Sequence, residues 1–401
     1  MSERGGGERP RGGRRAKWIL GLLPVVLLAV LVAVFLRFDP TRPFRAAFPP
    51  VEELTIERVT FPRAGLLRVH VVNGGPEPVT IAQVMIDEAY WQFTSDSDPT
   101  LRRLRNATIE VEYPWVAGEP HVIRLITATG VTFDHEVAVA TVTPRPSARY
   151  LTTFGLLGLY AGVIPVLLGL LWYPFLRRID RKWLHFYLSL TVGLLVFLLV
   201  DAFEHTLEAS AMVAEGFQSV GLITVGVVGA VLGLRALSGL GRRRESDGSG
   251  TPGLVVAYLI AIGIGLHNLG EGLAIGAAYS LGEIALGSFL VIGFALHNTT
   301  EGLAIVAPVA DERPALWHLG LMGVIAGLPT VAGAWVGGFA YSPLAATFFL
   351  ALGAGAIIQV IIEVGRLVQR SWPRGLFSPL NAAGLALGLL LMYGTALMVV
   401  A

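Results

Sequence analysis

Long apolar segments separated by short polar connections make up the chain from Tyr150 onward. Each segment is close to or above the roughly 20 residues that a helix needs to cross a bilayer. Because backbone polar groups must be satisfied inside lipid, such segments are typical of membrane-spanning helices. The pattern predicts an all-α membrane bundle in residues 150–401, with eight spans at 150–174, 184–205, 216–237, 252–279, 284–308, 316–340, 344–368 and 379–400.

Another apolar run, from Trp18 to about Leu36, follows a basic segment at the amino terminus. The combination is similar to a signal peptide, but the run is long enough to cross a bilayer. The sequence Phe38-Asp39-Pro40 also lacks the small residues of a cleavage site. We interpret residues 18–37 as a retained transmembrane anchor and residues 1–17 as a basic cytoplasmic tail.

Residues 44–148 have a different pattern, in which apolar and polar positions alternate over short stretches. Alternation with a period of two predicts strands that bury one face, and turn sequences such as Asn73-Gly74-Gly75-Pro76 separate them. We predict a β-sandwich of immunoglobulin type. Its histidines, His70, His121 and His135, lie on different predicted strands and are interpreted as ordinary strand residues. The predicted strands are 54–59, 67–71, 79–84, 108–112, 121–125 and 136–139.

The composition supports membrane residence and excludes several function classes. Hydrophobic residues make up 54% of the chain and charged residues only 15%, against about 25% in soluble domains. The absence of cysteine excludes a disulfide-stapled ectodomain, a thiolate metal site and a cysteine nucleophile. A net charge of +1 provides no electrostatic argument for binding nucleic acid.

Basic residues lie in alternate connections between the predicted spans. The connections at 206–215, 280–283 and 341–343 carry no lysine or arginine. By the positive-inside rule, the amino terminus and the basic connections are cytoplasmic, and the sandwich and carboxyl terminus are extracytoplasmic. We therefore predict a multi-pass protein of the plasma (inner) membrane. The basic connections carry Arg177, Arg178, Arg181, Lys182, Arg242, Arg243, Arg244, Arg313, Arg370 and Arg374.

The fourth and fifth predicted spans contain the same polar pattern near their centres. His-Asn-x-x-Glu-Gly-Leu-Ala-Ile occurs at 267–275 and again at 297–305. Only a tight turn joins the two spans, so the helices run antiparallel and side by side. A single polar residue in a span is usually interhelical glue. Two copies of one pattern at equal depth instead favour a functional site.

The residue types in the repeat are ligands for a divalent cation. His267 and Glu271 are four positions apart and share one helix face, as do His297 and Glu301. Two imidazoles and two carboxylates suit Zn²⁺, and also Fe²⁺ or Mn²⁺. Ionisable residues at the bilayer centre cost about 2.5–3.5 kcal/mol each, a penalty that a cation would offset.

The remaining polar residues of the repeat, Asn268 and Asn298, lie about 100° further around each helix. Their amide oxygens are expected to face a neighbouring second position.

These motifs resemble those of the ZIP (Zrt-/Irt-like) family of divalent-metal transporters, in its bacterial branch. The resemblance covers residues 150–401, and the anchor and sandwich are additions. It implies an eight-span fold with both ends outside and metal-binding His-Asn-x-Pro-Glu-Gly motifs in the fourth and fifth spans. Carried over, the metal ligands are His267, Asn268, Glu271, His297, Asn298 and Glu301.

Three departures from the family pattern change what the resemblance implies. Gly270 and Thr300 replace the proline before each glutamate, so the family's helix kink is not expected from these positions. Thr330 stands where the sixth span often has a glutamate, which predicts a weaker second metal position or a single one. The segment 241–250 has no histidine, which argues against metal sensing there.

Further polar residues are candidates for an entrance and an exit. Asp201, Glu204, His205 and Glu208 form an acidic stripe at the outer end of the second span. Such a stripe gathers cations at a pore mouth or is a solvated helix end. In the seventh span, Glu363 either serves an exit path or pairs with Arg366.

Uptake of a divalent metal, most simply zinc, into the cytoplasm is the function that the sequence favours. The metal is cargo, with Zn²⁺, Fe²⁺, Mn²⁺ and Co²⁺ all open, and no cofactor or enzymatic activity is predicted. The alternatives are an intramembrane metallohydrolase, which lacks a His-Glu-x-x-His motif here, and a metal-responsive receptor that signals through the sandwich. The sequence leaves open the coupling ion, a homodimer and the partner of the sandwich.

Overall fold

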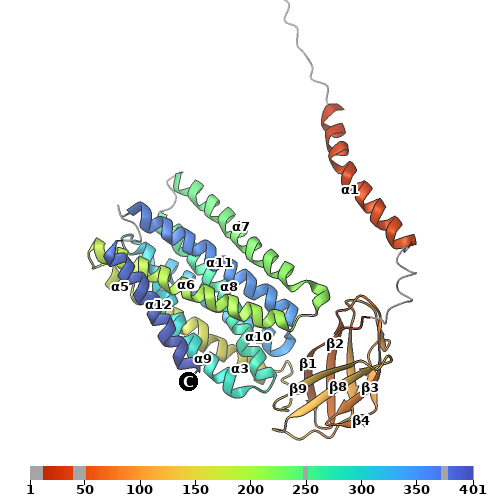
Figure 1. The fold of residues 1–401 in the computed structure, drawn as a ribbon. Helices are drawn as coiled ribbons and strands as arrows, with labels where there is room; N and C mark the ends of the chain where they lie inside the picture. The colour runs from red at the N-terminus through yellow and green to blue at the C-terminus, as the bar shows by residue number, and fades with distance from the viewer. Residues whose placement is uncertain (1–11, 39–50, 247–251, 372–377, 401) are drawn as a thin grey trace, which may run out of the picture. The chain divides into compact units, whose positions relative to one another are not determined.

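The computed structural model of the protein describes residues 12–38, 51–246, 252–371 and 378–400 (Figure 1). The chain divides into two compact units, Met1–Val51 and Glu52–Ala401, and each is described by itself.

The first unit contains one described helix, α1, at Gly12–Phe38. It begins inside the predicted basic tail, and its stretch Leu22–Phe35 is apolar and exposed along its whole length. Residues 1–11 and 39–50, which include most of the predicted tail, lie outside the described residues.

Two antiparallel β-sheets follow, in the region where the sequence predicts strands (Figure 1). One sheet has the order β1-β2-β7-β5, and the other has the order β4-β3-β8-β9, with β6 paired to β3. The six predicted strands correspond to β1, β2, β3, β7, β8 and β9, although β9 ends two residues before the predicted strand does. The strands are β1 (Leu54–Arg63), β2 (Leu66–Asn73), β3 (Val79–Ile86), β4 (Ala89–Trp91), β5 (Phe93–Ser95), β6 (Thr100–Leu101), β7 (Asn106–Val111), β8 (His121–Thr127) and β9 (Thr132–Val137).

The core of the sheets consists of the alternate apolar side chains that the period-two pattern predicts. Val69 and Val71 of β2, Ile109 of β7, and Ile123 and Leu125 of β8 are fully buried. The short strands β4, β5 and β6 were not predicted, because two or three residues are too few to show an alternation.

Eight helical segments of the second unit are long and apolar enough to cross a membrane, so the chain is a multi-pass membrane protein. All eight predicted spans are confirmed as helices. The segments are Ala148–Leu176, Arg181–Ala211, Glu215–Gly239, Gly253–Ser280, Ile284–Val309, Leu316–Ala340, Pro343–Gln369 and Pro379–Leu397.

The first segment is interrupted and the rest are nearly continuous helices. Their elements are α3 (Ala148–Gly158), the π-helix η1 (Leu159–Val163), α4 (Ile164–Leu170), α5 (Tyr173–Leu176), α6 (Arg181–Ala211), η2 (Glu215–Phe217), α7 (Ser219–Ser246), α8 (Pro252–Ser280), α9 (Ile284–Val306), η3 (Ala307–Val309), α10 (Leu316–Ala340), α11 (Pro343–Ser371) and α12 (Pro379–Val400). Residues 241–246, predicted as a connection, therefore belong to α7.

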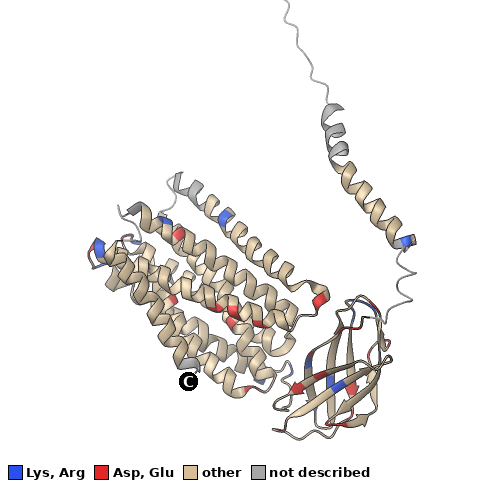
Figure 2. Cartoon of the chain, viewed as in Figure 1, with Lys and Arg blue, Asp and Glu red and all other residues tan. Residues whose placement is uncertain are grey.

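Successive segments run in opposite directions, so the bundle has two ends. We call the end at which α3 begins the proximal end. It also carries the connections 212–218, 281–283 and 341–342. The other end, the distal end, carries the connections 177–180 and 310–315. Figure 2 shows acidic residues in the middle of the bundle and basic residues towards the distal end, near α5.

Glycines allow the helices of the bundle to approach closely. A Cβ atom on Gly272 of α8 would lie 2.1 Å from the carbonyl oxygen of Thr330 in α10. A Cβ atom on Gly169 of α4 would lie 2.1 Å from the carbonyl oxygen of Thr299 and 2.7 Å from the Cα of Gly302, both in α9. Close backbone approach of this kind is how small residues join helices in lipid.

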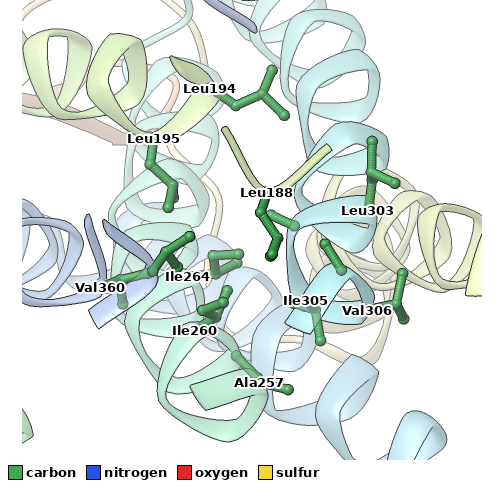
Figure 3. Close-up of a cluster of buried hydrophobic side chains, with 14 of the residues drawn as sticks. Leu188, Leu194, Leu195, Ala257, Ile260, Ile264, Leu303, Ile305, Val306 and Val360 are labelled. Atoms are coloured by element: carbon green, nitrogen blue, oxygen red, sulfur yellow. The ribbon is translucent and has the colours of Figure 1, made fainter. Parts of the chain in front are cut away.

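The largest hydrophobic core of the bundle lies in its distal half (Figure 3). We call its central part the distal apolar cluster and define it as Leu195 and Leu198 of α6, Ile260 and Ile264 of α8, and Val360 of α11. These side chains are at most 2% exposed.

Replacing Gly169 by alanine is expected to lower the melting temperature of the purified protein by several degrees. The added methyl group collides with α9 backbone, and overpacking costs about 1–3 kcal/mol. Gly229→Ala in α7 is the matched control, because nothing lies within 4 Å of its Cβ position. Differential scanning fluorimetry compares the two variants, and equal melting temperatures would contradict the packing.

Acidification is expected to loosen the β-sheets through His70 of β2. Burial, together with Arg58 and Arg68, lowers the pKa of His70 from 6.5 to about 4. The unfolded chain therefore binds a proton that the folded sheet excludes, so stability falls as the pH drops from about 6.5 towards 4. Hydrogen exchange of β2 peptides at pH 7 and pH 5, corrected for intrinsic rates, measures this loss.

In the His70→Gln variant the pH-dependent loosening should be smaller, since glutamine does not titrate in this range. His318→Gln, outside the sheets, is the control. An unchanged pH dependence after His70→Gln would contradict this assignment.

Candidate functional site

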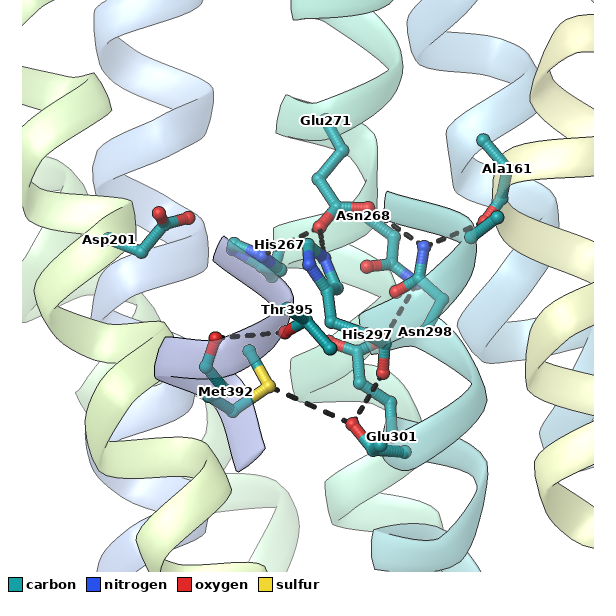
Figure 4. Close-up of polar contacts among 12 residues, drawn as sticks. Ala161, Asp201, His267, Asn268, Glu271, His297, Asn298, Glu301, Met392 and Thr395 are labelled. Atoms are coloured by element: carbon teal, nitrogen blue, oxygen red, sulfur yellow. Dashed lines mark hydrogen bonds and ion pairs between the residues drawn. The ribbon is translucent and has the colours of Figure 1, made fainter. Parts of the chain in front are cut away.

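The two copies of the repeated motif meet near the middle of α8 and α9. His267, Glu271, His297 and Glu301 are buried, as are both motif asparagines. Figure 4 shows their side chains directed into one space between the two helices. The structure thus brings together all six residues that the sequence predicts as metal ligands.

Glu271 lies at the centre of the contacts. Its Oε1 atom is 3.1 Å from Nε2 of His267 and also contacts Nε2 of His297. Its Oε2 atom accepts a hydrogen bond of 2.9 Å from the side-chain amide of Asn298. One carboxylate of α8 therefore contacts polar side chains of both helices.

The asparagines cross between the helices in a symmetric manner. Asn298 of α9 donates to Glu271 of α8, and Asn268 of α8 donates to Glu301 of α9 over 3.2 Å. The same amide groups also donate to backbone carbonyls outside the motif, Asn298 to Ala161 at 2.9 Å and Asn268 to Ala326 at 3.1 Å. This second set of contacts ties the site to η1 and α10.

Three oxygen atoms at the centre of the site have no hydrogen-bond partner among the residues that the structure describes. They are Oδ1 of Asn268, Oδ1 of Asn298 and Oε1 of Glu301, and all are buried. Leaving a buried acceptor unsatisfied costs about 1–3 kcal/mol, and more for a charged group. A bound cation is one kind of partner that satisfies such acceptor atoms, and a hydrogen-bond donor such as water is another.

A ligand set suitable for a metal ion is present within this space. One nitrogen of His267, one nitrogen of His297 and one carboxylate oxygen of Glu301 lie within 4.8 Å of one another, and all three residues are buried. Imidazole and carboxylate together suit Zn²⁺, Fe²⁺, Mn²⁺ and Co²⁺. Among the described residues of the chain, only these form a group of three such ligands.

A proline in the first spanning segment explains why the carbonyl of Ala161 accepts a hydrogen bond from Asn298. Pro165 follows the π-helix η1 and has no backbone N–H. It therefore cannot donate to the carbonyl of Ala161 four residues earlier, as an α-helical residue would. Asn298 donates to that carbonyl instead, so the irregular backbone orients a side chain of the site.

A cavity of about 290 Å³ connects the site with the proximal end of the bundle. His267 and Glu271 line its inner part, His205 and Glu208 of α6 line its wall, and Glu283 belongs to the α8–α9 turn at the proximal end. On the other side of the site, the distal apolar cluster fills the space between the helices (Figure 3). The site is therefore approached from the proximal end.

The predicted entrance residues are only partly brought to this cavity. His205 lies 3.2 Å from Glu208 and 3.7 Å from Asp201, so these three form one group on α6. Figure 4 places Asp201 beside the site, on the neighbouring helix. Glu204 is exposed and is not among the residues that line the cavity.

The predicted exit residue, Glu363 of α11, lies in the distal half within a polar group of its own. It accepts hydrogen bonds from Ser238 at 3.0 Å, from Gln359 at 2.9 Å and from Arg366 at 3.2 Å. The pairing with Arg366 is therefore present, and the exit role stays a prediction.

Sequence reasoning missed three contributors to the site. Glu283 lies in the turn that joins the two motif helices and lines the cavity. The one feature of the sequence that could have pointed to it is its negative charge in a connection that has no basic residue. The contact with the carbonyl of Ala161 could have been suspected from Pro165, because a proline within a predicted span leaves a backbone carbonyl without its helical donor. Thr330, by contrast, was singled out from the sequence. It is buried, and its hydroxyl lies against Gly162 of η1.

Comparisons with protein-family models and with curated proteins find no match to this chain.

Replacing Pro165 by alanine is expected to weaken metal binding about 3- to 10-fold. The new N–H competes with Asn298 for the carbonyl of Ala161, and a hydrogen bond contributes about 0.5–1.5 kcal/mol. Isothermal titration of the purified protein with Zn²⁺ measures the change. Pro174→Ala in α5, an exposed proline, is the control, and equal affinities for all three proteins would contradict the positioning of Asn298.

Proposed function

We propose that this chain is a divalent-metal transporter of the ZIP type, with Zn²⁺ as the leading cargo and Fe²⁺, Mn²⁺ and Co²⁺ as further candidates. The observation that carries the proposal is the pair of crossed asparagine–glutamate contacts around three unsatisfied oxygens. A purely structural polar cluster gains nothing from buried acceptors without donors. A cluster that binds a cation needs such acceptors, because their lone pairs face the cation.

The proposed route begins at the proximal cavity and continues past the site. The cation is attracted by the carboxylates of Glu208 and Glu283 and exchanges its water for His267, His297 and Glu301. Release at the distal end requires the distal apolar cluster to separate, so α8 and α9 must move against α6 and α11. A cavity on one side of a midplane site and close packing on the other favour alternating access.

The orientation of the proposed transport follows from the charge distribution. The distal connections and the start of α6 carry Arg177, Arg178, Arg181, Lys182 and Arg313, and the proximal connections carry no lysine or arginine. The positive-inside rule makes the distal end cytoplasmic and the direction inward.

Helix α1 and the two β-sheets are assigned to sides of the membrane by the same orientation. We propose that α1 is a transmembrane anchor of the plasma membrane, with the amino terminus in the cytoplasm. The two antiparallel sheets then form an extracytoplasmic immunoglobulin-like sandwich.

Metal uptake into proteoliposomes tests the proposal. The parent protein is expected to take up Zn²⁺, with Fe²⁺, Mn²⁺ and Co²⁺ as competitors to be ranked. Glu271→Gln and Glu301→Gln should each reduce uptake about 10-fold or more, because changes even to groups that only support a metal's ligands typically cost 10- to 100-fold. A fluorescent metal indicator inside the vesicles measures the rate.

Glu119→Gln serves as the matched control for insertion and stability, since this carboxylate is exposed in a loop of the β-sheet region. Parent-like uptake by both site variants would overturn the site assignment. Tight Zn²⁺ binding without any flux would overturn transport and favour the metallohydrolase. Removal of residues 1–148 should leave uptake intact, whereas a receptor would lose its response.

A further inference from the structure

A second cavity, of about 260 Å³, lies in the distal half of the bundle. Trp172, with Phe175 of α5, forms one wall, Phe186 and Tyr187 of α6 form another, and Leu391 of α12 closes a third side. The side chains that line this cavity carry only three polar groups, which are the hydroxyls of Tyr187 and Thr300 and the indole N–H of Trp172. The rest of the lining is apolar and offers no partner for ordered water.

The cavity faces the outside of the bundle. Trp172, Phe175 and Leu391 are 40%, 50% and 43% exposed, which is far from the burial of a closed core. In a multi-pass membrane protein, the exposed surface of spanning helices contacts lipid. An apolar cavity on this surface is therefore accessible to acyl chains.

A cluster of basic residues adjoins the cavity. Two walls of the cavity, Phe175 and Phe186, are joined by the short α5–α6 connection. This connection and the start of α6 carry Arg177, Arg178, Arg181 and Lys182, all of them exposed. Figure 2 shows basic residues at this end of the bundle, near α5.

The neighbouring acidic residues neutralise only part of this charge. Asp180 lies within the connection, the carboxylate of Asp311 is 3.9 Å from Arg181, and Glu312 follows Asp311. With Arg313 included, five basic residues at this end face these three acidic ones. The guanidinium of Arg177 lies 5.6 Å from the centre of the Tyr173 ring, and Arg177 is exposed. The cluster therefore keeps a net positive charge next to an apolar cavity.

We propose that this part of the protein binds an anionic phospholipid, with one acyl chain in the cavity and the phosphate on Arg177 and Arg178. Only an amphiphile with a negative headgroup uses both features. A neutral lipid leaves the arginines unpaired, and a soluble phosphate leaves the cavity unfilled. Basic groups beside crevices between spanning helices are a common way of recognising anionic headgroups. The proposal does not depend on metal transport.

The position of the cavity gives the lipid a structural role. Thr300, which lines the cavity, precedes Glu301 of the candidate metal site in α9. Its hydroxyl donates to the carbonyl of His297, so a residue that lines the cavity contacts the backbone of a residue of the candidate metal site. An acyl chain here fills the space between α9 and its neighbours α6 and α12.

Native mass spectrometry of the full-length protein in detergent tests the proposal with two lipids of identical acyl chains, phosphatidylglycerol and phosphatidylcholine. Phosphatidylglycerol should be retained preferentially. The Arg177→Gln/Arg178→Gln variant should reduce its apparent affinity between about 5- and 25-fold, since each basic residue near the membrane contributes about fivefold. Arg235→Gln, an exposed arginine of α7, is the matched control.

Filling the cavity tests the other half of the proposal. Leu391→Trp should abolish retention of phosphatidylglycerol, and Leu390→Trp should not, because Leu390 is on the same helix and 64% exposed but does not line the cavity. Leu387→Trp, one turn away, is a second filling variant in case the first fails to fold, as judged by its melting temperature.

Four results would overturn the proposal. The first is equal retention of both lipids by the parent protein. The second is an unchanged affinity after both arginine substitutions. The third is parent-like retention in the folded filling variants. The fourth is full competition by glycerol phosphate. Either of these last two results would show adsorption of an anion without a bound acyl chain.

Discussion

The crossed hydrogen bonds between α8 and α9 are the interaction on which the centre of this protein depends. Two glutamates and two histidines in the middle of spanning helices are unfavourable in lipid unless partners satisfy them. Asn298 and Asn268 each donate to the glutamate of the opposite helix, so neither helix can be displaced alone without leaving a buried carboxylate unsatisfied. One oxygen of each asparagine and one oxygen of Glu301 are buried without a hydrogen-bond partner among the described residues.

The surrounding helices hold this pair in position through backbone as well as side chains. Gly272 allows α8 to lie against α10, and Gly169 and Gly302 allow α4 and α9 to meet. The carbonyls of Ala161 and Ala326 each accept a hydrogen bond from a site asparagine. The amide groups are therefore oriented from outside the motif, and their oxygens face inward as a consequence.

The two halves of the bundle differ in their physical character. The proximal half contains a cavity with carboxylates that leads to the site, and the distal half is closed by the distal apolar cluster. Aromatic side chains and basic residues then follow at the distal surface, where the second cavity lies. The proximal half therefore has an opening that leads to buried polar side chains, and the distal half has a closely packed apolar core.

The sequence by itself determined the eight spans, the strand region and the two motifs, because hydropathy and period reflect local burial in lipid or in a sheet. It also predicted that His267, Glu271, His297 and Glu301 share a space, since a tight turn forces two repeated helices together. Only the tertiary structure decided which groups bond to which. The carbonyl of Ala161, the turn residue Glu283 and the separation of Glu204 from the cavity depend on how helices distant in sequence pack, and a local pattern carries no information about that packing.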